Sequence, residues 1–183
     1  MEDYLIEHCS PTLASLKTAN LFNYMYDSEA ELADYIGNLN RNLGKKGVTV
    51  DVLRKYEHSA LIYVFRERKL QEDLQKDGVR EFLVRAGYED FSTEQVLRRL
   101  KLRFHEDGAF PHEIGLFLGY PLGDVMGFIE NAGRNSKCSG CWKVYCNECE
   151  AIKLFARFDK CREVYKRLFK QGKSLLQLTV AAG

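Results

Sequence analysis

The order of hydrophobic and polar residues along this 183-residue chain predicts both strands and helices. Two segments rich in β-branched and apolar residues, 48–53 and 60–65, have the length and composition of strands. Residues 54–59 between them suit a hairpin connection, so we expect the two strands to pair antiparallel. Residues 20–26 alternate and are rich in aromatic side chains, a pattern that fits either another strand or the continuation of a helix.

Helical spacing of apolar residues predicts most of the remaining structure. Ser10 followed by Pro11 is typical of a helix start, because serine caps the first turn and the missing proline N–H has no partner there anyway. Ser28 and Glu31 form a capping box for a helix that ends near residues 44–47. Further helices are expected from residue 69 to 87, after 92–94, and from 147 onward, where the buried stripe of the last helix includes Cys161.

Residues 110–133 predict two short helices joined by a tight turn. The first opens at 110–113 and ends at Gly119, and the second begins at Pro121. This spacing is typical of a helix-turn-helix. The second helix, residues 122–131, carries two acidic residues and no lysine or arginine, which argues against contacts with DNA phosphates or guanine edges.

These elements predict an α+β protein. We expect a single domain over residues 1–183, with a small antiparallel or mixed sheet of three to four strands, helices around it and the helix-turn-helix-like hairpin. A further strand around Trp142, within residues 137–146, is expected to join the same sheet. With 45% hydrophobic residues, a chain of this size has enough apolar surface to form a core without disulfides or a structural metal.

Charge and hydropathy limit the partners and the compartment. Lys and Arg total 27 and Asp and Glu total 26, so no net field favours a nucleic acid or an anionic membrane. The chain has no apolar run long enough to cross a bilayer and begins with no export signal, so a cytoplasmic location is expected. Its oligomeric state is left open.

Four of the six cysteines form two CxxC pairs, Cys138–Cys141 and Cys146–Cys149. Residues 142–145 between the pairs contain no turn former and should run extended. Five extended steps place the inner two cysteines roughly 16 Å apart, whereas two sulfurs on one zinc lie under about 5 Å apart. We therefore do not expect the two pairs to share a metal.

Cys9 and His112 are the main candidates for a reactive site. Both stand at predicted helix starts, where the helix dipole favours a thiolate and a neutral imidazole. Together with Glu113, which is placed to orient a ligand or move a proton, they are the predicted catalytic group. Cys9, His112 and Cys138 are the predicted metal ligands, for zinc, iron or haem. For each, ordinary packing in a core or a helix end is the structural alternative.

Arg134 and Lys137 lie in a polar loop that suits a phosphate or carboxylate of a cofactor. The alternative is a plain connecting loop, since loops favour such residues. The sequence contains no P-loop, GxGxxG fingerprint or GxSxG elbow, so the common nucleotide-binding and hydrolase classes have no support.

Three segments, taken in order, resemble one known family. They are HCSPTLASLKTANLF at 8–22, FPHEIGLFLGYP at 110–121 and WKVY at 142–145. The chain resembles a family of similar length from anaerobic Gram-positive bacteria, known as the domain of unknown function number three-seven-nine-three. The resemblance implies a single small cytoplasmic domain and points to iron or redox physiology. It also implies that Cys9, Cys138 and Cys161 belong to the family pattern, whereas Cys141, Cys146 and Cys149 are departures from it.

Three functions follow as hypotheses. The first is a module that binds a metal, haem or other small ligand at a cysteine–histidine site linked to iron or redox metabolism. The second is a thiol-dependent enzyme with Cys9 as nucleophile or redox centre, and the third is a nucleic-acid-binding helix-turn-helix regulator. Small molecules or metal ions are thus the expected partners, and neither a membrane nor a nucleic acid is expected.

Overall fold

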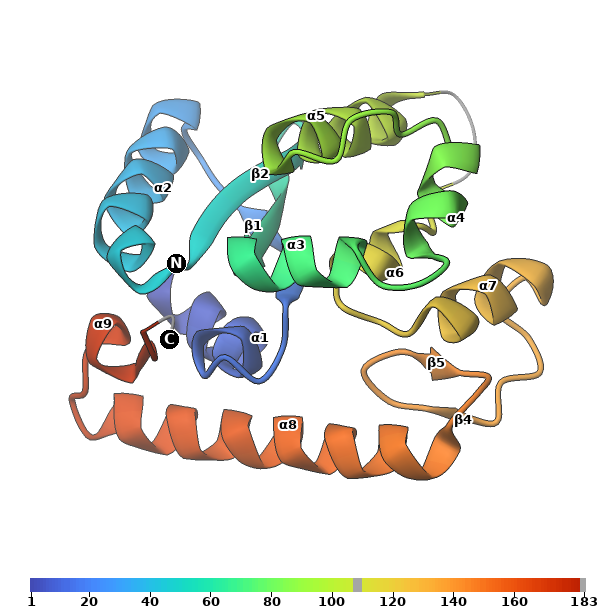
Figure 1. Cartoon of the computed structure of the whole chain (residues 1–183). Helices are drawn as coiled ribbons and strands as arrows, with labels where there is room; N and C mark the ends of the chain where they lie inside the picture. The colour runs from blue at the N-terminus through green and yellow to red at the C-terminus, as the bar shows by residue number, and fades with distance from the viewer. Residues whose placement is uncertain (107–109, 182–183) are drawn as a thin grey trace.

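The computed structural model describes residues 1–106 and 110–181, which fold into helices around a small antiparallel sheet (Figure 1). In chain order the elements are α1 (Glu2–Leu13), β1 (Ala19–Met25), α2 (Glu29–Leu43), the 3-10 turn η1 (Gly44–Lys46), β2 (Thr49–Lys55), β3 (Ser59–Phe65), α3 (Glu67–Leu74), α4 (Val79–Arg85), α5 (Thr93–His105), α6 (Ile114–Phe117), α7 (Leu122–Glu130), β4 (Cys138–Ser139), β5 (Lys143–Val144), α8 (Glu148–Lys170) and α9 (Leu175–Leu178). The α+β class predicted from the sequence is confirmed.

The sheet has the order β1–β3–β2 and is antiparallel throughout. The predicted hairpin of β2 and β3 is present, and the segment predicted at 20–26 forms the third strand, β1, over Ala19–Met25 rather than the continuation of a helix. From Ala60 to Phe65 every residue of the central strand β3 is buried. This strand is continuously apolar because both faces of the sheet are covered.

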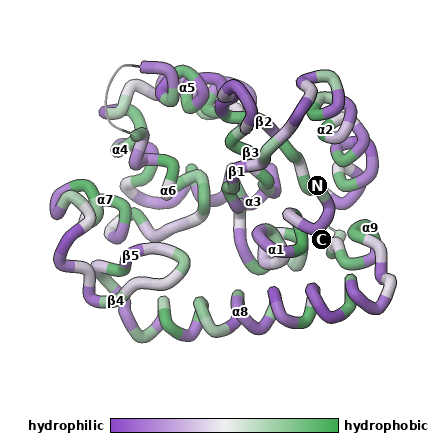
Figure 2. The backbone as a smooth tube through the Cα atoms, turned by 180° about the vertical axis from the view of Figure 1, so that it is seen from behind, coloured by the Kyte–Doolittle hydropathy of each residue, from purple (hydrophilic) through white to green (hydrophobic). Residues whose placement is uncertain are grey.

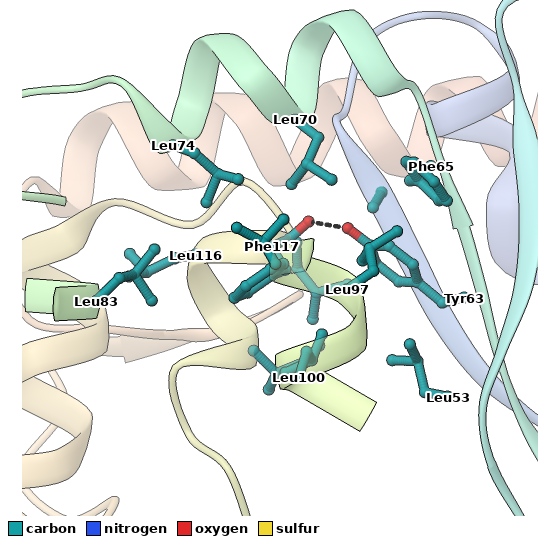
Figure 3. Packing of buried hydrophobic residues seen from close by; sticks show 14 of the residues in the cluster. Leu53, Tyr63, Phe65, Leu70, Leu74, Leu83, Leu97, Leu100, Leu116 and Phe117 are labelled. Carbon is teal, nitrogen blue, oxygen red and sulfur yellow. Dashed lines mark hydrogen bonds between the residues drawn. The ribbon is translucent and has the colours of Figure 1, made fainter. Parts of the chain in front are cut away.

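Each face of the sheet carries its own hydrophobic core. On one face Tyr63 and Phe65 pack with α3, α4, α5 and α6, and the Tyr63 hydroxyl donates a hydrogen bond to the Phe117 carbonyl at 2.6 Å (Figure 3). On the other face Ile62 and Val64 pack with α1, α2 and α9. A buried tyrosine therefore links the sheet to the short helix α6, the first helix of the predicted helical hairpin.

The long helix α8 runs along one side of the molecule, packs against α1 and leads from the β4–β5 hairpin to α9 (Figure 1). Hydrophilic and hydrophobic stretches alternate along it (Figure 2). Its buried residues include Phe155, Phe158 and Cys161, which confirms the core position predicted for Cys161. No helix among the described residues is long and apolar enough to cross a membrane.

The predicted helix start at Ser10 and Pro11 is wrong. Helix α1 begins at Glu2, and both residues lie near its C-terminal end. The Ser10 hydroxyl donates back to the Ile6 carbonyl instead of capping a first turn. The helical spacing that decides the boundary lies upstream, where Leu5, Ile6 and Cys9 form the buried face.

The prediction that the Trp142 segment joins the main sheet is also wrong. Strands β4 and β5 form a separate two-stranded hairpin that packs on α7, and Trp142 lies in its turn. The turn closes where the Gly140 N–H donates to the Trp142 carbonyl. The backbone N–H groups of Tyr145 and Cys146 donate to the Asp124 carboxylate, at 2.8 and 2.9 Å. These two groups therefore have hydrogen-bond acceptors without a neighbouring strand.

Candidate functional site

Asp124 of α7 holds the β4–β5 hairpin in place. Its side chain is buried, with one carboxylate oxygen accepting the two backbone N–H groups of Tyr145 and Cys146. The other oxygen accepts the indole N–H of Trp142 at 2.8 Å. A buried carboxylate that accepts three hydrogen bonds is well satisfied. Asp124 therefore fixes the orientation of Trp142 as well as the path of the chain.

A cavity of about 320 Å³ lies between the α6–α7 segment and this hairpin. We call it the aromatic cavity, because five of its twelve lining residues carry ring side chains. Its lining residues are Phe110, His112, Ile114, Gly115, Tyr120, Asp124, Val125, Phe128, Ser139, Gly140, Trp142 and Lys143. The volume and the mostly apolar lining are those of a small-molecule pocket.

His112 provides a free polar group in the aromatic cavity. Its ring lies 5.0 Å from that of Phe128 and 5.9 Å from that of Phe110, measured between centroids. Within the described part of the chain, neither ring nitrogen has a hydrogen-bond partner. Lys143, also in the wall, donates to the Gly133 carbonyl at 2.5 Å. His112 is thus free to hydrogen-bond a molecule inside the cavity, as is the hydroxyl of Ser139, which also lines it.

A second cavity, of about 410 Å³, shares Tyr120 and Gly140 with the first. We call it the polar cavity, because charged and polar side chains from α1, β1 and α8 line much of it. Its lining residues are Glu7, His8, Lys17, Asn20, Leu21, Leu118, Tyr120, Gly140, Cys141, Phe155, Phe158, Asp159 and Arg162.

Lys17 is the most unusual residue of the polar cavity. Only 8% of its surface is exposed, and its amino group lies 5.0 Å from the centroid of the Tyr120 ring. Burial lowers the pKa of Lys17 from 10.5 to about 8; Cys141 and Cys9 oppose this effect and Arg162 adds to it. The Tyr120 ring in turn stacks on the ring of Trp142, with 4.7 Å between the two centroids. A single aromatic stack therefore separates Lys17 from the aromatic cavity.

Arg162 and Cys141 complete the charged part of the polar cavity. The guanidinium of Arg162 forms an ion pair with Asp159, one turn earlier on α8, and lies 3.9 Å from the Cys141 sulfur. Asp159 and Cys141 both raise the pKa of Arg162. The Cys141 carbonyl accepts a hydrogen bond from the Tyr120 hydroxyl at 3.2 Å. The turn of the β4–β5 hairpin thus contacts both Tyr120 and α8.

The structure does not support the activation of Cys9 that the sequence suggested. Cys9 is fully buried in the core on the α1 face of the sheet, eight residues from the Met1 N-cap. Burial raises the pKa of its thiol, with a smaller opposing effect of Lys17. A helix N-terminus would have lowered that pKa. Because α1 begins at Glu2, this effect does not operate at Cys9.

Glu113 is next to His112 in sequence but not in the aromatic cavity. Its buried carboxylate accepts a hydrogen bond from Arg103 at 2.8 Å and one from the Tyr88 hydroxyl at 3.4 Å. Tyr88 and Arg103 both belong to the α3–α6 side of the molecule. Glu113 thus anchors the segment that carries His112, while its catalytic role remains a prediction.

The described residues contain no group of three or more His, Cys, Asp and Glu side chains that could hold a metal ion. The structure therefore does not gather Cys9, His112 and Cys138 into one centre. Cys138 lies on β4, where burial, Glu148 and Asp124 raise the pKa of its thiol. The CxxC pairs form no four-cysteine cluster either, although the hairpin turn at Gly140 falls inside the first pair, where the sequence reading placed no turn.

Arg134 and Lys137 lie in the connection between α7 and β4, outside both cavities. Both are exposed, and the Lys137 amino group donates to the Cys146 carbonyl at 2.8 Å. Their predicted role in binding a cofactor has no further support in these contacts.

Several residues of the two cavities carry no signal that sequence reasoning can use. Lysine and arginine are almost always exposed, so nothing marks Lys17 and Arg162 as cavity residues. Asp124 reads as an ordinary acidic residue in the first turn of α7. Tyr120 is different, because it stands between Gly119 and Pro121 at the turn of the predicted helical hairpin. That position indicates a fixed side chain, although not the cavity beside it.

The fold and the two adjoining cavities define an α+β protein with a small-molecule-sized pocket beside a buried lysine. The chain belongs to the family described as protein of unknown function (DUF3793), whose family model matches residues 5–179. This confirms the resemblance seen in the sequence. Neither the curated proteins nor the solved structures contain a match to the chain.

Proposed function

We propose that this protein binds a small molecule with a flat, mainly apolar ring in the aromatic cavity. The observation that carries the proposal is the imidazole of His112, which has no hydrogen-bond partner among the described residues and shares the wall with the aromatic rings of Phe110, Tyr120, Phe128 and Trp142. Aromatic faces bind flat apolar groups by stacking and edge contacts. One polar group with unused hydrogen-bonding capacity then selects ligands that place a donor or acceptor opposite it.

The positions of the wall residues support this function. Trp142 is held by Asp124 and stacks on Tyr120, so two sides of the cavity are fixed before a ligand arrives. A preformed site avoids the cost of ordering side chains on binding. The ligand-binding module of the first hypothesis is therefore retained, with His112 and without a contribution from Cys9.

The test uses Trp142, the one tryptophan of the chain. N-phenylnaphthylamine, a neutral apolar dye, absorbs at the wavelengths where tryptophan emits, so dye bound in the aromatic cavity quenches Trp142 by energy transfer. We expect saturable quenching with one dye per chain. Phe128→Ala should weaken binding about tenfold, because an aromatic wall is lost. His112→Leu keeps the apolar wall and should have a smaller effect on this neutral dye.

The matched controls are Phe91→Ala and His58→Leu. Phe91 is half-buried like Phe128 but packs on the α3–α6 core, and His58 is exposed in the β2–β3 turn. Both should leave the dye affinity unchanged. Equal weakening by Phe91→Ala and Phe128→Ala, or quenching that never saturates, would overturn the proposal.

A further inference from the structure

The polar cavity contains a buried cation without a counter-ion. Other lysines of the described chain, such as Lys55, Lys101 and Lys166, lie at 2.5 to 2.8 Å from a carboxylate and are more exposed. The amino group of Lys17 has neither an acidic partner nor a hydrogen-bond acceptor among the described residues. Its contact with the Tyr120 ring offsets only part of the cost of burying a charge.

The acidic residues of the cavity wall do not neutralise Lys17, because each is paired with another cation. Glu7 accepts a hydrogen bond from Lys166 at 2.6 Å, and Asp159 is paired with Arg162. When Lys166, which lies outside the lining, is counted with Glu7, Lys17 is the cation that has no acidic partner. A buried charge of this kind is satisfied when an anion of opposite charge enters.

Further hydrogen-bond donors line the same cavity. The Asn20 side chain accepts a hydrogen bond from the Thr12 hydroxyl at 2.7 Å through its oxygen, which turns its NH₂ group away from that contact. This NH₂ group has no acceptor among the described residues. Arg162, on the facing helix α8, has donors beyond those used by Asp159 and Cys141.

We propose that the polar cavity binds the oxyanion of a small carboxylate or phosphate compound through Lys17, Asn20 and Arg162. This site is separate from the proposed ring-binding function, since it uses another cavity and other side chains. A volume of about 410 Å³ leaves room for a metabolite-sized molecule around its charged group. Tyr120, which lines both cavities, is the wall between the two ligands.

The competing explanation is that Lys17 serves only as the partner of the Cys141 thiolate. Cys141 lies in the same wall and its negative form raises the pKa of Lys17. In that case an added anion would find the charge already neutralised. An added oxyanion should therefore raise the pKa of Lys17 under the first explanation and leave it unchanged under the second.

The experiment follows the titration of Lys17 by NMR in the full chain labelled with ¹³C at lysine Cε. Sulfate is the probe, because it is fully ionised over the whole titration, and chloride at equal ionic strength is the reference. We expect sulfate to raise the Lys17 midpoint by about one unit, since a bound anion favours the charged amine. The other lysine signals in the same spectrum are the internal control. Lys17→Met identifies the signal.

Four further variants complete the test. Asn20→Ala and Arg162→Gln should each reduce the sulfate-induced shift by about half or more, while Lys166→Gln should reduce it less. The proposal is overturned if sulfate leaves the midpoint unchanged while Cys141→Ser lowers it, because Lys17 would then be the partner of the thiolate. It is also overturned if all lysine signals respond to sulfate alike.

Discussion

At the scale of single residues, Lys17 shows how a side chain can work against the stability of the fold. Burial lowers its pKa from 10.5 to about 8, so the unfolded chain holds this proton more tightly than the folded chain. The contribution of Lys17 to the free energy of unfolding is therefore unfavourable at low pH, and the protein becomes more stable as the pH increases from about 8 to 10.5. Below pH 8 the cost of the buried charge is present in full.

Replacing Lys17 with methionine removes this cost. We expect Lys17→Met to raise the free energy of unfolding by about 2 kcal/mol at pH 7, because an apolar side chain of similar length fills the same space. The gain should shrink towards zero near pH 10.5, where Lys17 of the parent protein is neutral. Urea unfolding of both proteins at pH 7 and pH 10 measures the difference.

The control for this comparison is Lys166→Met, since Lys166 is partly exposed and paired with Glu7 on the surface. That variant should change stability little at either pH. Two results would contradict the conclusion that the buried charge of Lys17 destabilises the fold. One is a Lys17→Met protein that is less stable than the parent at pH 7, and the other is the same change in the free energy of unfolding at both pH values.

Comparison of His112, Lys17 and Cys9 shows how much of the site could be predicted from the sequence. His112 stands in a recognisable FPHE segment and was predicted as a site residue, and the structure places it in a cavity. Lys17 has no such signal, because its burial results from segments that are distant in sequence. Cys9 looked reactive only because the helix start was assigned nine residues too late, by a Ser–Pro pair that in fact lies near the end of α1.

At the scale of elements, the connection between α6 and α7 determines the shape of the aromatic cavity. Gly119 adopts a positive φ of 78°, which lets the chain reverse between the two helices. Gly115 allows them to pack closely, because a Cβ at this position would lie 2.7 Å from Cγ2 of Val125 and 3.2 Å from Cδ2 of Tyr120. Val125 and Tyr120 both line the cavity.

A methyl group at Gly115 should therefore disturb both the packing and the cavity. We expect Gly115→Ala to destabilise the protein by about 1 to 3 kcal/mol, because Val125 is buried and has little room to move. It should also weaken dye binding. Gly44→Ala is the matched control, since nothing lies within 4 Å of a Cβ at that position. Thermal or urea unfolding of the two variants checks the prediction, and similar stabilities would show that the close approach is not needed.

The elements also show why some structure could be predicted and some could not. Strands β2 and β3 were predictable, because their apolar runs and short connection are local signals. The β4–β5 hairpin was not, because its N–H groups are satisfied by Asp124, which lies on another element. Residues 142–145 look like an extended strand of the main sheet until this acceptor is known.

At the scale of the whole molecule, three segments distant in sequence meet around Tyr120. Lys17 and Asn20 come from the first segment of the family resemblance, His112 and Tyr120 from the second, and Trp142 from the third. The sequence singled out these three segments, but it did not predict that they line two adjoining cavities. Helix α8 closes the arrangement on one side (Figure 1).

The most direct test of ligand binding in the aromatic cavity is NMR of the ¹⁵N-labelled protein, in which Trp142 gives the one tryptophan indole N–H signal. Unlabelled indole, a flat two-ring molecule with one N–H donor, is the probe. We predict that the Trp142 indole signal and the His112 ring signals shift together, with one saturable midpoint, and that Phe128→Ala raises this midpoint about tenfold. If indole leaves both sets of signals unchanged while it shifts others elsewhere, the aromatic cavity is not a binding site.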